Sequence, residues 1–193
     1  MCSKPRGNCW RAGLRSWADI ARRVRVPLGF LFAIIYVWLA RPSRESLLLG
    51  AAICLPGLAL RALASGHVQK NTSLTTTGPY ACTRNPLYLG SLVLAAGFAV
   101  AARRWWVVIA IVTLFAVVYL PVVLAEERFL RERFPEFAEY ERRVPRFVPR
   151  WAPAEERQGR FSSQLYWKHR EYNAVLGAFA MMAALAVKMV WFH

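Results

Sequence analysis

The sequence predicts an all-α, polytopic membrane protein with about five transmembrane helices and further helices on its cytoplasmic surface. Three observations lead to this prediction. Hydrophobic residues make up 56% of the 193 residues, and the mean hydropathy of +0.27 is high for a soluble domain. Five stretches approach the roughly 17 to 25 mainly apolar residues that a bilayer-spanning helix needs. Most basic residues outside these stretches fall on one side of the predicted membrane.

The predicted spans, in chain order, cover residues 27–40, 46–64, 86–102, 105–125 and 173–192. The first is the shortest, and it reaches spanning length only if Val24 and Val26 join it while Arg25 extends toward the lipid headgroups. Residues 41–45 join spans one and two, and residues 103–104 join spans three and four, so each pair is expected to be antiparallel.

Four residues inside the predicted spans depart from the apolar helix pattern. Pro56 and Pro121 lie in spans two and four, where each removes a backbone hydrogen bond and is expected to bend its helix. Arg61 and Lys188 lie near span ends, and we expect both side chains to extend to the headgroups.

The net charge of +15 is explained by membrane topology rather than by nucleic acid. With a cytoplasmic N-terminus, three basic regions share one side, namely residues 4–25, Lys70 with Arg84, and residues 128–170. The opposite side keeps only four arginines, which are Arg41, Arg44, Arg103 and Arg104. The positive-inside rule therefore predicts a multi-pass protein whose N-terminus is cytoplasmic, and no nucleic-acid partner is expected.

The first 26 residues and the cysteines indicate no further processing or metal site. The basic N-terminal segment has no apolar core followed by a cleavage site before Pro27, so a cleaved signal peptide is not expected. Cys2, Cys9, Cys54 and Cys82 have no spacing typical of zinc ligands, so no metal is expected.

The segment EERFLRERFPEFAEYERRVPRFVPRW, at residues 126–151, predicts two short helices on the membrane surface. Leu130, Phe134 and Phe137 recur at helical spacing and give the segment one apolar face. Pro135 divides it, since proline suits the first turn of a second helix, which we expect to end before Pro145.

The candidate site begins with GPYACTRNPLYLG, at residues 78–90. Pro86 favours a helix start at the cytoplasmic surface, where unsatisfied N–H groups beside Arg84 form an anion site. Tyr80 and Tyr88 add aromatic faces that can contact a base or a cation. Span four returns to the same surface at Glu126, whose carboxylate can bind an amine or hydroxyl groups.

The pattern GPYxxxRNPxYxG followed by EExxLxxxFPxFxxYxxRVPRFVP resembles the isoprenylcysteine carboxyl methyltransferase family, which is related to the phospholipid methyltransferases. Members are integral membrane enzymes that use S-adenosylmethionine. The resemblance covers about residues 65–149. We therefore divide a single membrane domain, 1–193, into a basic cytoplasmic N-terminus (1–26), a methyltransferase-like core (65–149) and a linker with the C-terminal membrane helix (152–193).

The resemblance also implies the residues that bind the cofactor, which are Ser73, Leu74, Thr75, Tyr80, Asn85, Pro86, Tyr88 and Glu126. Two positions depart from the family pattern. Asn85 replaces a histidine of the eukaryotic members, and Val122 replaces an arginine that the prenylcysteine enzymes carry one turn before the glutamate. The candidates to replace that arginine are Arg142, Arg143 and Arg146.

The predicted function is methyl transfer from S-adenosylmethionine to a membrane lipid or lipidated substrate, with the site at the cytoplasmic surface. The lipophilic acceptor is an isoprenylcysteine-like carboxylate or a lipid headgroup. Arg84 and His67 are the candidate catalytic residues, His67 as the base that an amine acceptor would need. Two alternatives stay open: an NADPH-dependent enzyme resembling the sterol reductases, and a membrane protein without catalytic activity.

Overall fold

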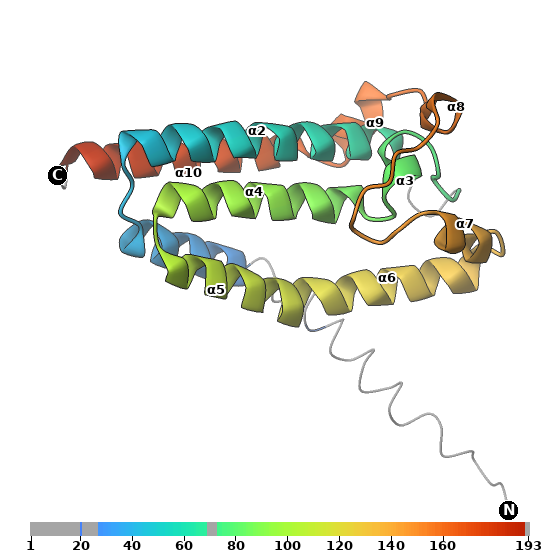
Figure 1. The fold of residues 1–193 in the computed structure, drawn as a ribbon, viewed down its shortest axis with the longest axis horizontal. Coiled ribbons are helices and arrows are strands. Elements are labelled where there is room, and N and C mark those ends of the chain that lie inside the picture. Colours follow the sequence, from blue (N-terminus) through green and yellow to red (C-terminus); the bar gives the residue numbers. More distant parts are fainter. Residues whose placement is uncertain (1–19, 21–26, 69–72, 192–193) are drawn as a thin grey trace, which may run out of the picture.

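The computed structural model describes residue 20 and residues 27–68 and 73–191, and within these ranges the chain forms helices and no strand (Figure 1). The predicted all-α class is confirmed. Most of the predicted cytoplasmic N-terminus (1–26), as well as Lys70 and the end of the last predicted span at residue 192, lies outside the described residues.

Five apolar helices occupy the five predicted spans. The described elements are the helix Pro27–Leu39, α2 (Arg44–His67), α3 (Pro79–Cys82), α4 (Pro86–Ala102), α5 (Trp105–Leu114), the π-helix η1 (Phe115–Tyr119), α6 (Leu120–Arg133), α7 (Phe137–Arg143), α8 (Ala154–Arg157), α9 (Ser163–Lys168) and α10 (Tyr172–Trp191). Three of the described helices are long and apolar enough to cross a membrane, namely Arg44–His67, the continuous Trp105–Arg133, and Tyr172–Trp191. The helices Pro27–Leu39 and Pro86–Ala102 are apolar but shorter.

The helix ends follow local sequence signals. Ser43 caps α2, because its side chain accepts a hydrogen bond from the Ser46 N–H while the Ser46 hydroxyl accepts one from the Ser43 N–H. Pro86 occupies the first turn of α4, as predicted, and the C-cap residue Arg103, directly after α4, has a left-handed conformation with φ of 52°.

The outer surface of the bundle is apolar. Large side chains on the long helices face outward, including Phe179 and Leu48, which are 75% and 73% exposed. The long helices run side by side along one axis, while α3, α7, α8 and α9 gather at one end (Figure 1). An apolar exterior of this extent is typical of a protein surrounded by lipid.

Glycines bring α2 and α4 into close contact along their length. The pairs are Gly50 with Gly97 and Gly57 with Gly90, an order that requires α2 and α4 to be antiparallel. A Cβ atom on Gly97 would lie 2.7 Å from the Gly50 carbonyl oxygen, and one on Gly57 would lie 2.9 Å from the Gly90 carbonyl oxygen. Small residues therefore set the spacing of these two helices.

Arg61 and Lys188 bind groups within the protein, and these contacts were not predicted from the sequence. The Arg61 guanidinium in α2 donates to both carboxylate oxygens of Glu171, at 2.8–3.1 Å. The Lys188 ammonium in α10 donates to the carbonyl oxygens of Val37 and Trp38, at 2.7 and 2.5 Å. Each cation thereby ties α10, or the loop before it, to an earlier part of the chain.

The surface segment after span four differs from the prediction in one respect. The first expected short helix is the end of the continuous helix Trp105–Arg133, whereas the second is separate and forms α7, Phe137–Arg143. The predicted bend at Pro121 corresponds to the π turn η1, whose last hydrogen bond runs from the Leu120 N–H to the Phe115 carbonyl oxygen. A π turn accommodates an extra residue in a helix without interrupting it.

Candidate functional site

The two halves of the predicted motif meet through backbone hydrogen bonds. The loop before α4 turns at Gly78, whose φ of 62° and ψ of −133° favour glycine. Farther along, the Arg84 N–H donates to the Pro145 carbonyl oxygen, and the Arg150 N–H donates to the Cys82 carbonyl oxygen, both at 2.9 Å. The segment after α7 therefore lies directly against the loop that carries Arg84 and Asn85.

A buried carboxylate, Glu127 of α6, lies at the centre of this junction. Its side chain is only 5% exposed. The Asn85 amide donates to one carboxylate oxygen at 2.8 Å, and the Arg146 guanidinium donates to the other at 2.8 and 3.0 Å. A guanidinium nitrogen of Arg84 lies 3.6 Å from the second oxygen. These donors compensate for the loss of water around Glu127.

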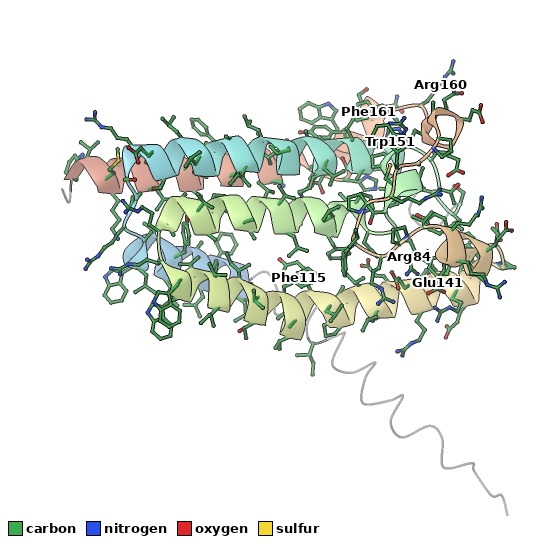
Figure 2. The ribbon with its side chains drawn as sticks, in the orientation of Figure 1. Arg84, Phe115, Glu141, Trp151, Arg160 and Phe161 are labelled. Atoms are coloured by element: carbon green, nitrogen blue, oxygen red, sulfur yellow. The ribbon has the colours of Figure 1, made fainter. Side chains whose placement is uncertain are left out.

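Arg84 links Glu127 to a second carboxylate, Glu141 of α7. One Arg84 Nη donates to Glu141 at 2.8 Å, and Arg131 of α6 donates to the same carboxylate. The hydrogen bond from Arg131 lowers the pKa of Glu141, and the hydrogen bond from Arg84 adds to that effect. Figure 2 shows Arg84 and Glu141 at the end of the bundle where α4, α6 and α7 meet.

We call these six residues the Glu127 network: Arg84, Asn85, Glu127, Arg131, Glu141 and Arg146. Its three arginines exceed its two glutamates by one positive charge. The Arg84 side chain is 9% exposed, and its buried Nε has no hydrogen-bond partner among the described atoms. A buried N–H donor without an acceptor is rare in folded proteins and points to an acceptor supplied by a ligand.

Four aromatic rings adjoin the network, and we call them the aromatic cluster: Tyr88, Phe115, Tyr119 and Phe147. Tyr88 of α4 meets Tyr119 edge to face, with ring centroids 6.2 Å apart. Phe115, labelled in Figure 2, stacks on Tyr119 and meets Phe147 at 5.6 Å. Phe115 and Tyr119 are the two ends of η1, so the π turn determines where these rings lie.

Tyr80 is buried beside the network. The Tyr140 hydroxyl of α7 donates to the Tyr80 carbonyl oxygen at 2.7 Å. Burial raises the pKa of the Tyr80 hydroxyl, with smaller contributions from Tyr140 and from the negative charge of Glu126. Burial likewise raises the pKa of Tyr140. Both hydroxyls are therefore neutral at physiological pH, and Glu126 is close enough to act on Tyr80.

The other predicted cofactor residues lie in the loop before α3 and at the start of α4. Leu74 packs against the buried cluster of Phe137, Tyr140 and Val144, while Ser73 is exposed and Thr75 is partly exposed in the same loop. Pro86 is buried at the start of α4. Of the arginines considered as replacements at the Val122 position, Arg146 joins the Glu127 network, whereas Arg142 and Arg143 are exposed on α7.

His67 has its own contacts at the end of α2. Its Nδ1 lies 2.7 Å from the Leu63 carbonyl oxygen, and its Nε2 lies 3.2 Å from the Gly159 carbonyl oxygen. The ring also meets Phe161 edge to face. Because both ring nitrogens face carbonyl oxygens, a role as a base would require one of these contacts to break.

Glu126 was predicted from the sequence, whereas the central position of Glu127 and the contribution of Glu141 were not. Helical periodicity gives a signal for Glu127, because it follows the fully buried Val123 by four residues. The same rule relates Glu126 to the buried Val122, so periodicity alone could not separate the two glutamates. Glu126 itself is partly exposed.

The family was identified by comparison with known proteins. The sequence model described as phospholipid methyltransferase matches residues 24–136. The chain belongs to the phospholipid methyltransferase family. This match confirms the resemblance to the integral membrane methyltransferases and supports methyltransferase activity. No solved structure matches this chain.

Two relatives carry names that refer to metals. The chain is 43% identical to the "Cobalt-zinc-cadmium resistance protein CzcN" of Cupriavidus metallidurans, and 38% identical to the "Nickel-cobalt-cadmium resistance protein NccN" of Alcaligenes xylosoxydans xylosoxydans. Each match extends over 82 residues, which is 42% of this chain and 38% of the relative, so the chain spans less than half the length of either. In the described parts of this chain, no three His, Cys, Asp or Glu side chains are arranged to hold a metal ion.

Proposed function

We propose that the protein transfers a methyl group from S-adenosylmethionine to a lipophilic acceptor, an isoprenylcysteine-like carboxylate or a lipid headgroup. The observation that carries the proposal is the buried, unsatisfied Nε of Arg84, located within the Glu127 network in a chain of this family. A site with a surplus positive charge and an unused donor suits a ligand that brings a carboxylate.

The residues near Arg84 match the groups of the cofactor. The Arg84 Nε and the first N–H groups of α4 are donors for its carboxylate, since α4 begins without a side-chain cap. The Glu126 carboxylate is an acceptor for its amine or ribose hydroxyls, and the faces of Tyr80 and Tyr88 suit its adenine and its sulfonium. The remaining proposed contacts are Ser73, Leu74, Thr75, Asn85 and Pro86. When bound, the cofactor supplies a methyl group that is already activated on sulfur.

In this arrangement Glu127 is a positioning residue. It accepts hydrogen bonds from Asn85 and Arg146 and lies near Arg84, so it orients three side chains around the start of α4. Asn85 uses its amide for this contact, which is a role that a neutral hydrogen-bonding side chain fills without titrating. The proposed division of labour therefore gives ligand contact to Glu126 and Arg84, and alignment to Glu127 and Asn85.

The aromatic cluster provides the apolar side of the proposed site. Val118 and Val122 are buried against Tyr88 and Tyr119, so an acceptor approaching there would meet rings and aliphatic side chains. Such a wall excludes water from the reacting groups. A carboxylate acceptor would need no base, which agrees with the occupied ring nitrogens of His67, whereas an amine acceptor would first have to lose a proton.

The test is equilibrium binding of S-adenosylmethionine to the purified protein in lipid nanodiscs, with NADPH as a parallel ligand. We expect saturable binding of the former, weakened about tenfold or more by Glu126→Gln. Glu132→Gln is the matched control, because Glu132 is an exposed residue of the same helix. This variant should bind S-adenosylmethionine with the affinity of the wild type. Transfer of a labelled methyl group to extracted membrane lipids then identifies the acceptor class.

Three other results would contradict the proposal in different ways. Binding of NADPH alone would favour an NADPH-dependent enzyme resembling the sterol reductases. Binding of neither ligand by folded protein would favour the non-catalytic alternative. Equal S-adenosylmethionine affinity in Glu126→Gln and the wild type would retain the cofactor but remove Glu126 from its site.

The names of the two relatives favour resistance to metal cations as a second candidate function. We propose that any such role depends on the methyltransferase site, because methylation of a lipid headgroup would change the binding of metal cations at the membrane surface. Cells lacking the protein should then grow poorly in cobalt, zinc or cadmium salts, and the wild type should restore growth while Glu126→Gln should not. Full rescue by Glu126→Gln would separate resistance from methylation.

A further inference from the structure

A second concave site lies at the end of the bundle opposite the Glu127 network. The end of the helix Pro27–Leu39 with the segment after it, the turn between α4 and α5, and the last turns of α10 line an open cavity of about 520 Å³. All three segments lie at the end where the C-terminus is drawn, far from α7 (Figure 1). Its wall includes Trp38, Arg41, Arg104 and Lys188.

The charges around this cavity have one sign. Arg41, Arg104 and Lys188 line it, and none of its lining residues is an acid. The three cations are close enough for Arg41 and Arg104 to act electrostatically on Lys188. None of the ion pairs found in the described ranges involves any of the three. Grouped like charges repel one another, and an anion between them removes that cost.

Backbone contacts hold the three cations at the cavity. Lys188 uses two of its three ammonium N–H groups on the carbonyl oxygens of Val37 and Trp38, so one donor is left for a ligand. The Arg41 N–H donates to the Ala102 carbonyl oxygen at 3.0 Å, which ties its loop to the end of α4. Arg104 immediately precedes α5, which begins without a side-chain cap and so presents unsatisfied N–H groups nearby.

Aromatic residues locate the cavity relative to a membrane. Trp38, Trp105, Trp106 and Trp191 are all exposed, and all lie in segments at this end of the bundle. Tryptophan is enriched where lipid headgroups meet the hydrocarbon core, so we expect the cavity to lie at headgroup depth. Phosphate is the anion that is most concentrated at that depth, and arginines bind it through paired N–H groups.

We propose that this cavity binds a phosphate group through Arg41, Arg104 and Lys188, independently of the methyltransferase site. The group belongs to an anionic lipid headgroup or to a free phosphate ion, since both present the same oxygens to the three cations. Either ligand would hold the first hairpin, the α4–α5 turn and α10 together at this end of the bundle.

The experiment measures binding of inorganic phosphate and of short-chain phosphatidylglycerol to delipidated protein in a neutral detergent. The test variant is Arg41→Gln with Arg104→Gln, and it leaves Lys188 and its helix contacts intact. The matched control is Arg44→Gln with Arg103→Asn, which removes the same charge at the start of α2 and the end of α4, close in sequence to Arg41 and Arg104, but changes no residue of the cavity wall. Asparagine tolerates the left-handed conformation of Arg103.

We expect the wild type to bind one phosphatidylglycerol per chain, and the test variant to bind it about tenfold or more weakly. The control should retain affinity within about threefold, since only screened charge is lost. Displacement of the lipid by inorganic phosphate would identify a free-ion site, and lack of displacement would identify a lipid-headgroup site. Equal loss in test and control would show general surface attraction and overturn the proposal, as would equal affinity in test and wild type.

Helical circular dichroism and elution volume show whether each variant is folded. Should the double variant be misfolded, Arg104→Gln alone gives the same comparison against Arg103→Asn. Binding of S-adenosylmethionine by the test variant should equal that of the wild type, so failure at this cavity is distinguishable from failure of the proposed function.

Discussion

At one end of the bundle Arg84, Arg131 and Arg146 each bind a carboxylate, whereas at the other end Arg41, Arg104 and Lys188 line a cavity that has no acid in its wall. The net charge of the chain does not distinguish these arrangements, because both consist of basic residues in loops and helix ends. The difference lies in their partners. Paired arginines connect segments of the chain, while unpaired cations remain available to an anion from outside.

The largest expected effect tests the paired end. Glu127→Ala should lower the free energy of unfolding by about 3 kcal/mol, because it leaves Arg146 and the buried Arg84 without this carboxylate. Unfolding by denaturant in a fixed detergent measures the change. The control, Glu132→Ala, alters an exposed residue of the same helix and should stay within about 0.5 kcal/mol of the wild type. Equal stability of the two variants would mean that the network does not hold this end together.

The next effect tests the rigid connection between the two ends. Gly97→Val would bring a side chain to within 2.7 Å of the Gly50 carbonyl oxygen, so we expect a loss of about 2 kcal/mol from overpacking. Gly177→Ala is the control, since a Cβ atom at Gly177 meets nothing within 4 Å, and its better helix propensity should leave stability unchanged or raise it by up to about 1 kcal/mol. The same denaturant titration compares the free energies of unfolding of the two variants. A harmless Gly97→Val would show that α2 and α4 are free to move apart.

A smaller effect on the free energy of unfolding is expected at low pH. The pKa of Glu141 is lowered in the folded protein, so its ionised form stabilises the fold above the ordinary glutamate pKa, and that stabilisation is lost as pH falls through the lowered value. Because Arg131 is exposed, the contribution should be under about 1 kcal/mol. Unfolding of the wild type and Glu141→Gln at about pH 6 and about pH 3.5 should give a stability gap that narrows in acid. A gap that is constant with pH would contradict the assignment.

The smallest effect is expected at the unpaired end. Arg104→Gln removes one of three like charges and breaks no described ion pair, so stability should change by less than about 0.5 kcal/mol or rise slightly in the absence of anions. Repeating the denaturant titration with added phosphatidylglycerol sharpens the contrast, because lipid should stabilise the wild type more than the variant. A loss as large as that of Glu127→Ala would mean that Arg104 has a structural partner.

The helices were predictable because their signals are local. The third predicted span, 86–102, coincides with α4, since Pro86 marks its start and the apolar run ends at Arg103. The polarity of the sequence did not predict where the helix of span four ends. The change at Glu126 marks the edge of the apolar region, but no helix-breaking residue follows until Pro135, so the helix continues to Arg133.

The site was predictable only in part, because its decisive contacts join distant segments. The motif predicted that Arg84, Asn85 and the glutamate pair lie at one surface. In the structure Asn85 donates a hydrogen bond to Glu127, 42 residues away in the sequence. Nothing in the spacing indicated which glutamate is buried, or that Arg61 binds Glu171 across 110 residues. Charged partners at such separations are chosen by the packing of helices, which local periodicity does not describe.

The π turn Phe115–Tyr119 has a consequence for the length of the chain. It takes up one residue more than an α-helical turn requires, so the register of α6 is offset from that of α5. Deleting a single residue there would convert it to an ordinary turn and leave the downstream side chains on their present faces. Deleting a residue of regular α-helix between Trp105 and Glu127 has no such compensation and would rotate everything downstream by about 100°. Glu127 would then leave Asn85 although neither residue had been changed. In this helix the number of residues before the carboxylate, as well as their identity, is part of what builds the site.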